Sequence, residues 1–263
     1  MRLDRRTFLA AAVSILAFAA PAVHAADAMA QIEKTKTIRI AVPTDYPPYG
    51  FVGIDLAPQG LDIDMAKLIA DKMGAKLELV PVTSANRIPY LQTAQVDLVI
   101  STLGKNEERL KVIDFSHAYA PFFQAVYAAK TLPMKSFADL AGKKIAVAKG
   151  AMEEQELTKL GPAGLDFKRY EDQAASTAAF VAGQADVLAT SVSNASLMAQ
   201  NNPHLGAELK LIIKESPCFV GVAKGQTALL AKVNAIILAA KTDGTIDKMS
   251  QTWLKKPAGE LPL

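Results

Sequence analysis

The sequence is poor in the side chains on which most catalysis depends. It contains one cysteine, Cys218, and three histidines, of which His117 and His204 lie beyond the first 25 residues. A single cysteine excludes an internal disulfide, and the sequence has no nucleophile elbow, metal-ligand spacing or phosphate-binding loop. We therefore expect a protein that is not an enzyme and that needs no metal or other cofactor.

A cluster of charge of one sign is also missing. The 29 basic and 26 acidic residues are spread along the chain and give a formal charge of +3. Nucleic-acid binding needs a basic patch or stripe, so we expect no nucleic-acid partner. The apolar content of 51% is high enough for a sizeable core in one large domain or two smaller ones.

The first 25 residues have a composition of their own. They contain, in order, the basic residues Arg2, Arg5 and Arg6, the apolar run 8–20 and the small-residue site Val23-His24-Ala25. This order predicts a signal peptide, residues 1–25, because the apolar run is shorter than the roughly 20 residues that cross a membrane. An uncleaved anchor is the alternative. The Arg5-Arg6 pair is typical of a twin-arginine signal, with an ordinary secretory signal as the alternative, and both routes predict a periplasmic protein.

Beyond this segment, short apolar runs typical of strands alternate with helical patterns. Strands are expected at 37–42, 76–80, 97–101, 122–128, 143–148, 187–190, 211–214 and 219–223. Helices are expected at 61–73, 88–93, 107–112, 152–160, 172–182, 193–200, 227–241 and 246–254. The alternation predicts an α/β fold with mostly parallel sheets covered by helices.

Two segments are candidates for crossings between lobes, Tyr127 to Lys130 and Val222 to Gly225. They predict one lobe from residues 34–128 plus 224–257 and a second lobe, inserted into the first, from residues 129–223. A double crossing of this kind leaves a cleft between the lobes, which is a usual place for a small-ligand site.

Two strand-to-helix turns are candidate anion sites. In the first, a strand ends at Ser101 and Thr102 just before a helix that Asn106 caps, and Arg109 near the helix start can hold a carboxylate with its planar guanidinium. In the second, a strand meets a helix through Gly150, and the helix start offers unpaired N–H donors. The alternatives are a surface arginine paired with a neighbouring glutamate and a plain tight turn.

The order and spacing of several short motifs resemble the polar amino-acid family (family 3) of periplasmic solute-binding proteins, which serve ATP-driven importers. The motifs are Tyr46-Pro47-Pro48-Tyr49, Gly60-Leu61-Asp62-Ile63-Asp64, Val96-Asp97-Leu98-Val99-Ile100-Ser101, Glu108-Arg109, Asp114-Phe115-Ser116, Leu140-Ala141-Gly142-Lys143 and Asp243-Gly244-Thr245. The resemblance runs from about Thr37 to Trp253. It implies the type II periplasmic binding protein fold, whose two α/β lobes close on a ligand, a monomeric state and a membrane ABC permease as partner.

The resemblance also implies roles for individual residues. The position of Tyr46 provides an aromatic wall, and Ser101 and Thr102 line the site. The Gly104 amide and the Arg109 side chain hold the ligand α-carboxylate, and a backbone N–H at Met152 joins them from the other lobe.

A narrower match and one departure bear on the ligand. The segment 83–89 is similar to the glutamate/aspartate-binding branch, in which the arginine at Arg87 faces the ligand side chain, while the alternative is a solvated arginine. The family's ammonium-binding aspartate should fall near Ser191, yet no Asp or Glu occurs between Val187 and Ala207. Gly104 also replaces a hydroxyl residue often found there. The ligand is therefore either an amino acid held by hydroxyls and carbonyls or a carboxylate without an α-ammonium group, and the first is favoured.

Three functions compete at this point. The favoured one is a transport receptor whose lobes close on an amino acid or a related small carboxylate. An enzyme on the same fold is the second, since some dehydratases resemble these proteins, and it would need an acid or base such as Glu153 or Glu154 in the cleft. The third is a sensor that presents its closed form to a receptor.

Overall fold

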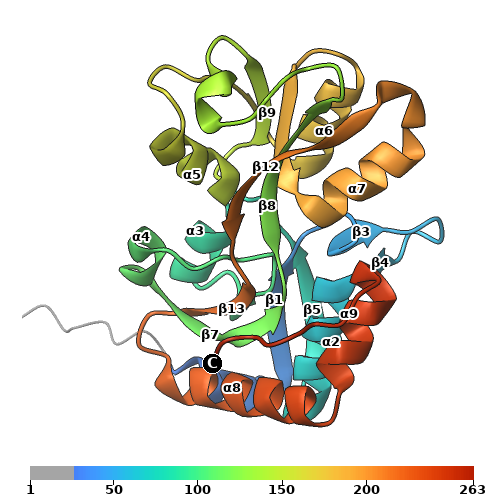
Figure 1. Ribbon diagram of the computed structural model, residues 1–263. Helices are drawn as coiled ribbons and strands as arrows, with labels where there is room; N and C mark the ends of the chain where they lie inside the picture. Colours follow the sequence, from blue (N-terminus) through green and yellow to red (C-terminus); the bar gives the residue numbers. More distant parts are fainter. Residues whose placement is uncertain (1–26) are drawn as a thin grey trace, which may run out of the picture.

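The computed structural model describes residues 27–263, which form two α/β lobes joined by extended segments (Figure 1). This confirms the two-lobed α/β fold expected from the sequence. The predicted signal peptide, residues 1–25, lies outside the described residues. Within the described part, no helix combines the length and the apolar character needed to cross a membrane.

Lobe 1 is built on a five-stranded sheet with the order β5-β1-β6-β13-β7. Its strands are β1 (Thr37–Val42), β5 (Lys76–Pro81), β6 (Leu98–Val99), β7 (Ile113–Ala120) and β13 (Cys218–Ala223). Its helices are α1 (Ala28–Thr35), α2 (Leu61–Met73), α3 (Arg87–Gln92), α4 (Glu107–Leu110), α8 (Thr227–Thr242) and α9 (Thr245–Leu254). A small sheet of β2 (Asp45–Tyr46), β3 (Gly50–Val52) and β4 (Pro58–Gln59) completes it.

The pattern of apolar residues explains these elements. In β1, Ile38 and Ile40 are buried and alternate with the less buried Thr37 and Arg39, and the strand ends in the fully buried Ala41 and Val42. In α2, apolar side chains recur at helical spacing on the face that packs against the sheet, and the helix ends at Gly74, whose φ of +62° suits the left-handed cap. Cys218 is a buried free thiol in the same core.

Lobe 2 is built on a second five-stranded sheet with the order β10-β9-β11-β8-β12. Its strands are β8 (Phe123–Ala129), β9 (Lys144–Ala148), β10 (Asp166–Tyr170), β11 (Val187–Ser191) and β12 (Ala207–Glu215). Its helices are η1 (Phe137–Leu140), α5 (Met152–Leu160), α6 (Gln173–Val181), α7 (Val192–Asn201) and η2 (Pro203–Leu205).

Each sheet is mixed, which refines the expectation of mostly parallel sheets. β1 is parallel to β5 and β6, and β9 is parallel to β10 and β11. β13 and β8 are antiparallel to both of their neighbours. The reason is the route of the chain: a strand that arrives from the other lobe enters its sheet at the cleft end, where the parallel strands finish.

The chain passes from the first sheet to the second between β7 and β8, and it returns between β12 and β13 (Figure 1). These passages contain Pro121 and Pro217 and lie earlier in the chain than the predicted crossings. Tyr127 to Lys130 covers the end of β8, and Val222 to Gly225 covers the end of β13. The apolar residues of β8 and β13 continue without a break to the ends of these strands, so hydrophobicity alone does not show where the chain changes lobes. Pro121 and Pro217 do indicate these places.

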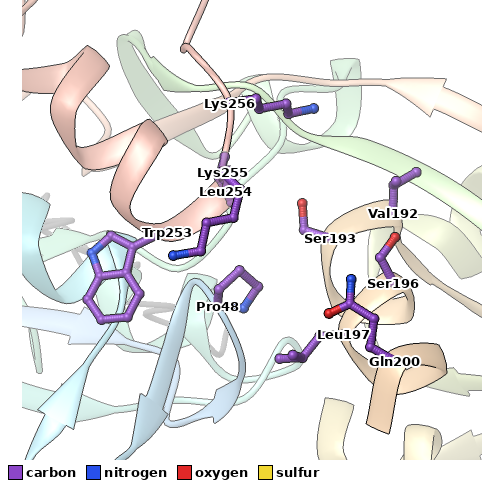
Figure 2. A pocket seen from close by; sticks show the side chains of 10 residues that line it. All are labelled: Pro48, Val192, Ser193, Ser196, Leu197, Gln200, Trp253, Leu254, Lys255 and Lys256. Atoms are coloured by element: carbon purple, nitrogen blue, oxygen red, sulfur yellow. The ribbon is translucent and has the colours of Figure 1, made fainter. Parts of the chain in front are cut away.

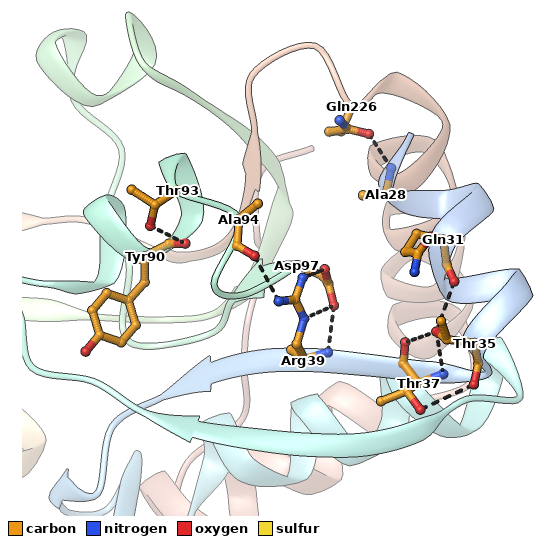
Figure 3. A network of polar contacts seen from close by, with 10 residues as sticks. All are labelled: Ala28, Gln31, Thr35, Thr37, Arg39, Tyr90, Thr93, Ala94, Asp97 and Gln226. Carbon is orange, nitrogen blue, oxygen red and sulfur yellow. Dashed lines mark hydrogen bonds and ion pairs between the residues drawn. The ribbon is translucent and has the colours of Figure 1, made fainter. Parts of the chain in front are cut away.

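A polar network fixes the end of lobe 1 that is farthest from the cleft (Figure 3). Arg39 of β1 donates from Nη2 to Asp97 Oδ1 at 2.6 Å and from Nη1 to the Ala94 carbonyl at 2.8 Å. Asp97 Oδ2 also accepts the Arg39 backbone N–H at 2.8 Å. The network holds β1 in register with the start of β6, and this aligns the carboxyl ends of both strands at the cleft.

Candidate functional site at the junction of the lobes

The two lobes contact each other through hydrogen bonds on several elements. Tyr46 Oη accepts the Ser191 backbone N–H at 2.9 Å and lies 3.0 Å from Thr190 Oγ1. Asn194 Nδ2 donates to the Pro47 carbonyl at 3.0 Å. Further along the junction, Asn106 of lobe 1 bonds to Gln155 of lobe 2, and Asp45 of lobe 1 bonds to Gln173 of lobe 2. The structure is therefore a closed form, with the strand ends of both lobes facing each other.

Arg109 is a buried cation at this junction. Asn106 caps α4 by accepting the Arg109 backbone N–H at 2.9 Å, and the Arg109 side chain is folded back to donate from Nη1 to the Gly104 carbonyl at 2.9 Å. Its Nη2 donates across the junction to the Gly150 carbonyl at 3.4 Å. Burial, helped by the positive charge of Arg87, lowers the pKa of Arg109 to about 9, so the guanidinium is still protonated at neutral pH.

Two glycines allow close packing across the junction beside Arg109. A Cβ atom on Gly104 would lie 2.7 Å from Met152 Cε and 2.7 Å from Ser216 Oγ. A Cβ atom on Gly150, whose φ is +75°, would lie 3.0 Å from Ala85 Cα of lobe 1. Met152, the first residue of α5, is buried there against Gly104, so its helix start faces the end of β6.

Arg87 is a second buried cation, only 3% exposed, at the first position of α3. Its Nη1 donates to the Ser101 carbonyl, and its Nε has no hydrogen-bond partner. Burial lowers the pKa of Arg87. The alternative of a solvated surface arginine does not fit this position.

Asp62 organises the loop between the two arginines. Its Oδ2 accepts the Thr102 backbone N–H at 2.8 Å and its Oδ1 accepts the Tyr119 hydroxyl at 2.8 Å. Thr102 has a φ of +45°, a left-handed conformation that this bond helps to hold. Burial raises the pKa of Asp62 to about 7, although the two hydrogen bonds and the Arg87 charge act in the opposite direction.

Asp62 was not among the predicted site residues. The sequence did carry a signal for it, because an acid at this position lies on the apolar face of the predicted helix 61–73.

The aromatic residues at the junction form one cluster. The ring centroids of Tyr46 and Tyr49 are 5.7 Å apart, and Phe122 lies 6.3 Å from Tyr46 and 5.2 Å from Tyr49. Ser191, beside this cluster, is fully buried, and its Oγ accepts the Asn194 backbone N–H at 3.1 Å as the cap of α7. The hydroxyl at the position expected for the family's ammonium-binding aspartate is thus used to start a helix, while the Ser191 backbone N–H bonds to Tyr46.

Glu153 is the acidic residue of lobe 2 at this junction. It is the second residue of α5, it is 3% exposed, and its Oε1 has no hydrogen-bond partner. Burial raises the pKa of Glu153, while the charges of Arg87 and Arg109 lower it. The sequence indicated Glu153 only as a possible catalytic acid, and its burial could not be told from that of Glu154 beside it.

The structure brings the predicted residues together at the junction of the lobes. Lobe 1 contributes Tyr46, Arg87, Ser101, Thr102, Gly104 and Arg109, and lobe 2 contributes Met152 and Ser191. A separate cavity of about 310 Å³ also spans the lobes, between α7 and the end of α9 (Figure 2). It is lined by Pro48, Val192, Ser193, Ser196, Leu197, Gln200, Trp253, Leu254, Lys255 and Lys256, none of which was a predicted site residue.

Comparison with known proteins decides the family. Residues 38–256 match the model of the bacterial extracellular solute-binding proteins, family 3. The chain is a family 3 solute-binding protein. It is 33% identical over 241 residues to the ABC transporter glutamine-binding protein of Bacillus subtilis (strain 168), covering 89% of this chain and 87% of that one.

Solved structures resemble this solute-binding protein over most of its length. An ancestral arginine-binding protein bound to arginine superposes with a TM-score of 0.78 at 34% identity, covering 83% of this chain and 98% of that one. An ancestral amino acid-binding protein described as a precursor of cyclohexadienyl dehydratase gives a TM-score of 0.76 at 31% identity, covering 86% and 98%.

These relatives bear on the enzyme alternative. The family and the curated relative are described as binding proteins, which supports the expectation that this solute-binding protein is not an enzyme. The dehydratase alternative is weaker, because the dehydratase precursor is itself described as amino acid-binding. Among residues 27–263, no group of three or more His, Cys, Asp or Glu side chains is placed to hold a metal ion.

Proposed function

We propose that this protein is the extracytoplasmic receptor of an ABC importer and binds a polar amino acid between its lobes. The observation that carries the proposal is the meeting of two buried guanidiniums, Arg87 and Arg109, with the start of helix α5 at the junction of the lobes. A carboxylate that enters a dry cleft needs charged donors of this kind, because its desolvation is costly. The family and the name of the glutamine-binding relative support an amino acid as the source of that carboxylate.

The residues at the junction divide the work. Arg109 would hold the α-carboxylate with its guanidinium, and the backbone N–H groups of Gly104 and Met152 would add donors from each lobe. Ser101 and Thr102 would line the site beside them. Tyr46 would form the aromatic wall, and Ser191 would close the far end through its contact with Tyr46.

Arg87 would select the ligand side chain. A second desolvated guanidinium, with a free Nε donor, favours an amide or carboxylate group and disfavours a cationic one. Glutamine- and arginine-binding relatives are both similar to this chain, so the choice between their ligands is open to experiment.

Ligand binding would close the lobes about the two connecting passages. We place the hinges at Pro121–Phe122 and Ser216–Pro217, where the chain changes sheets. A membrane ABC permease would then distinguish the closed, loaded monomer from the open one by its shape. Export with removal of residues 1–25 would deliver the protein to the periplasm.

Isothermal titration calorimetry of the purified protein with the amino acids and with small mono- and dicarboxylates tests this function. We expect one polar amino acid to bind far more tightly than the others, and L-glutamine or L-glutamate to bind at least about 10-fold more tightly than L-arginine. Arg87→Gln should narrow that preference by about 10-fold, because the variant keeps a donor for the Ser101 carbonyl but loses the charge.

Arg169→Gln is the matched control, since Arg169 lies on the surface of lobe 2 in an ion pair with Glu154. The variant removes the same charge far from the proposed ligand. Absence of binding for every amino acid, or equal weakening of all ligands by Arg87→Gln, would contradict the proposal.

A further inference from the structure

Two acidic side chains are buried to more than nine-tenths in the part of the chain that the structure describes, Asp62 and Glu153. They come from different lobes, and both lie close enough to Arg87 to interact with its charge. Asp45 also lies at the junction, but its Oδ2 accepts the Gln173 backbone N–H, so Asp62 and Glu153 are the candidates for the countercharge of a buried ligand cation.

Asp62 is already occupied by protein donors. The Thr102 N–H and the Tyr119 hydroxyl each take one of its oxygens at 2.8 Å. Both bonds come from lobe 1, so they persist whether the cleft is open or closed. Withdrawing Asp62 from them would release the left-handed Thr102 and the loop that follows it.

Glu153, unlike Asp62, has a carboxylate oxygen that can accept a hydrogen bond from a ligand. Its Oε1 lacks a hydrogen-bond partner although the residue is 3% exposed. The charges of Arg87 and Arg109 on lobe 1 act on Glu153, and Glu153 in turn raises the pKa of Tyr46, so its carboxyl group lies close to the lobe 1 side of the junction. Within residues 27–263, no ion pair of 4.0 Å or less joins Glu153 to either arginine, so neither of them neutralises it at contact distance.

The end of β11 cannot supply a negative charge for the ammonium group of a ligand. Residues 187–207 contain no Asp or Glu. The hydroxyls there are engaged, because Thr190 Oγ1 contacts Tyr46 Oη and Ser191 Oγ caps α7. Neutral groups compensate a desolvated ammonium only in part, whereas a charge-assisted bond to a carboxylate does so more fully.

We propose that the Glu153 carboxylate accepts hydrogen bonds from the α-ammonium group of an amino-acid ligand. This assignment rests on the proposed function, and it gives the α-ammonium group the acidic partner that is missing near Ser191. The carboxylate end of the ligand then binds Arg109 of lobe 1, and the ammonium end binds Glu153 of lobe 2. One zwitterion thereby joins the lobes through charges of opposite sign.

The assignment predicts how the protein discriminates between ligands. An analogue without the ammonium group would leave Glu153 buried and unpaired in the closed form, which is more costly than the loss of one hydrogen bond. The preference for the amino acid over its deamino analogue is therefore the quantity that Glu153 controls. If Glu153 only supported the fold, its substitution would weaken the binding of both ligands equally.

Calorimetry with matched ligand pairs tests this. The probes are L-glutamine with 4-carbamoylbutanoate and L-glutamate with glutarate, each pair differing only in the α-ammonium group. We expect the wild type to prefer the amino acid by at least about 100-fold in the pair that binds. Glu153→Gln, which is nearly isosteric, should reduce that preference by about 10- to 100-fold, mostly by weakening the amino acid.

Glu154→Gln is the control. Glu154 is the next residue of α5 and carries the same charge, but it is paired with Arg169 on the surface of lobe 2, so its loss should leave the preference unchanged. Thermal melts of both variants report on folding. An unchanged preference in folded Glu153→Gln overturns the assignment while leaving the proposed function intact. Binding of the carboxylates but of no amino acid by the wild type overturns both.

Discussion

The two lobes contribute different chemistry to the cleft. Lobe 1 presents two buried guanidiniums, and each is held by a carbonyl of its own lobe: Arg87 by Ser101 and Arg109 by Gly104. Asp62 fixes the loop between them. Lobe 2 presents a helix start, buried hydroxyls and Glu153, whose Oε1 bonds to nothing in the closed form.

The two lobes are therefore prepared for ligand binding to different degrees before they close. The cationic half in lobe 1 is arranged mainly by bonds within that lobe, and only the bond from Arg109 Nη2 to the Gly150 carbonyl depends on closure. In lobe 2 the Ser191 hydroxyl already caps α7, but the Ser191 backbone N–H gains its partner Tyr46 only when the lobes meet. We therefore expect ligand to bind first to lobe 1 and the approach of lobe 2 to complete the site.

The largest effect should come from removing the main cation of lobe 1. Arg109→Ala should weaken ligand binding by about 2 to 5 kcal/mol, or roughly 30-fold to several-thousand-fold, because a desolvated carboxylate loses its charged partner. Arg109→Lys should recover only part of this, since an ammonium lacks the planar fork. Calorimetric titration measures both variants.

Folding should survive both changes at Arg109, and circular dichroism melts check this. If Arg109→Ala binds the ligand within about threefold of the wild type, the cation is not the carboxylate partner, and the comparison between the lobes fails.

The second effect concerns pH and the stability of lobe 1. The pKa of Asp62 is raised from 3.8 to about 7, so the folded protein holds this proton more tightly than the unfolded chain. The stability that this gives is fully present below about pH 4 and is lost as the pH rises to about 7. Asp62→Asn should remove this loss, worth about 2 to 4 kcal/mol across that range.

Urea unfolding of the wild type and Asp62→Asn at several pH values measures the difference between their free energies of unfolding. The asparagine carbonyl can still accept from Thr102, so the loop should stay in place. A difference that is constant from pH 4 to pH 7 would show that Asp62 titrates normally in the folded protein.

The third effect tests the closed junction itself. Tyr46→Phe removes the hydroxyl that accepts the Ser191 N–H and contacts Thr190. The closed form then has an unpaired buried donor, which should weaken ligand binding by about 1 to 2 kcal/mol, roughly 5- to 30-fold. Tyr127→Phe is a control within lobe 2, because its hydroxyl contacts only Ser196 of the same lobe. Equal effects of the two variants on the calorimetric affinity would argue against a role in closure.

The smallest effect should come from Gly104→Ala. The new Cβ would meet Met152 Cε and Ser216 Oγ at 2.7 Å in the closed form. Both are ends of side chains that can move, so we expect an affinity loss of only about 3- to 10-fold, or about 1 kcal/mol. The thermal stability of the ligand-free protein should change little. Gly74→Ala should instead lower the thermal stability and leave the affinity unchanged, because Gly74 has a φ of +62° and open space around it.

The elements with strong periodicity could be predicted from the sequence. β1, α2 and α5 begin and end at the residues expected for them. β10 was missed because it is an edge strand, half exposed and rich in charged residues. β7 was missed because polar residues interrupt it, among them Ser116, whose Oγ accepts the Val220 N–H inside the sheet.

The candidate site was predictable where a residue type implies its own chemistry, as for Arg109. For the other residues of the site, the sequence could not show which side chains are buried. The sequence could not distinguish Glu153 from Glu154, because the helix turns one carboxyl into the junction and the other toward Arg169. It also could not show that the Ser191 hydroxyl caps α7, since a cap depends on where the helix begins.

The position of β13 in the first sheet has a consequence for the order in which the chain folds. β13 lies between β6 and β7, and Gly221 pairs with Val99 across more than a hundred residues of intervening chain. The five strands of the second sheet are consecutive along that chain, so their contacts form over shorter separations. On a ribosome, lobe 2 can therefore assemble while lobe 1 still lacks a central strand. The half that presents the guanidiniums would be the last to take its final form.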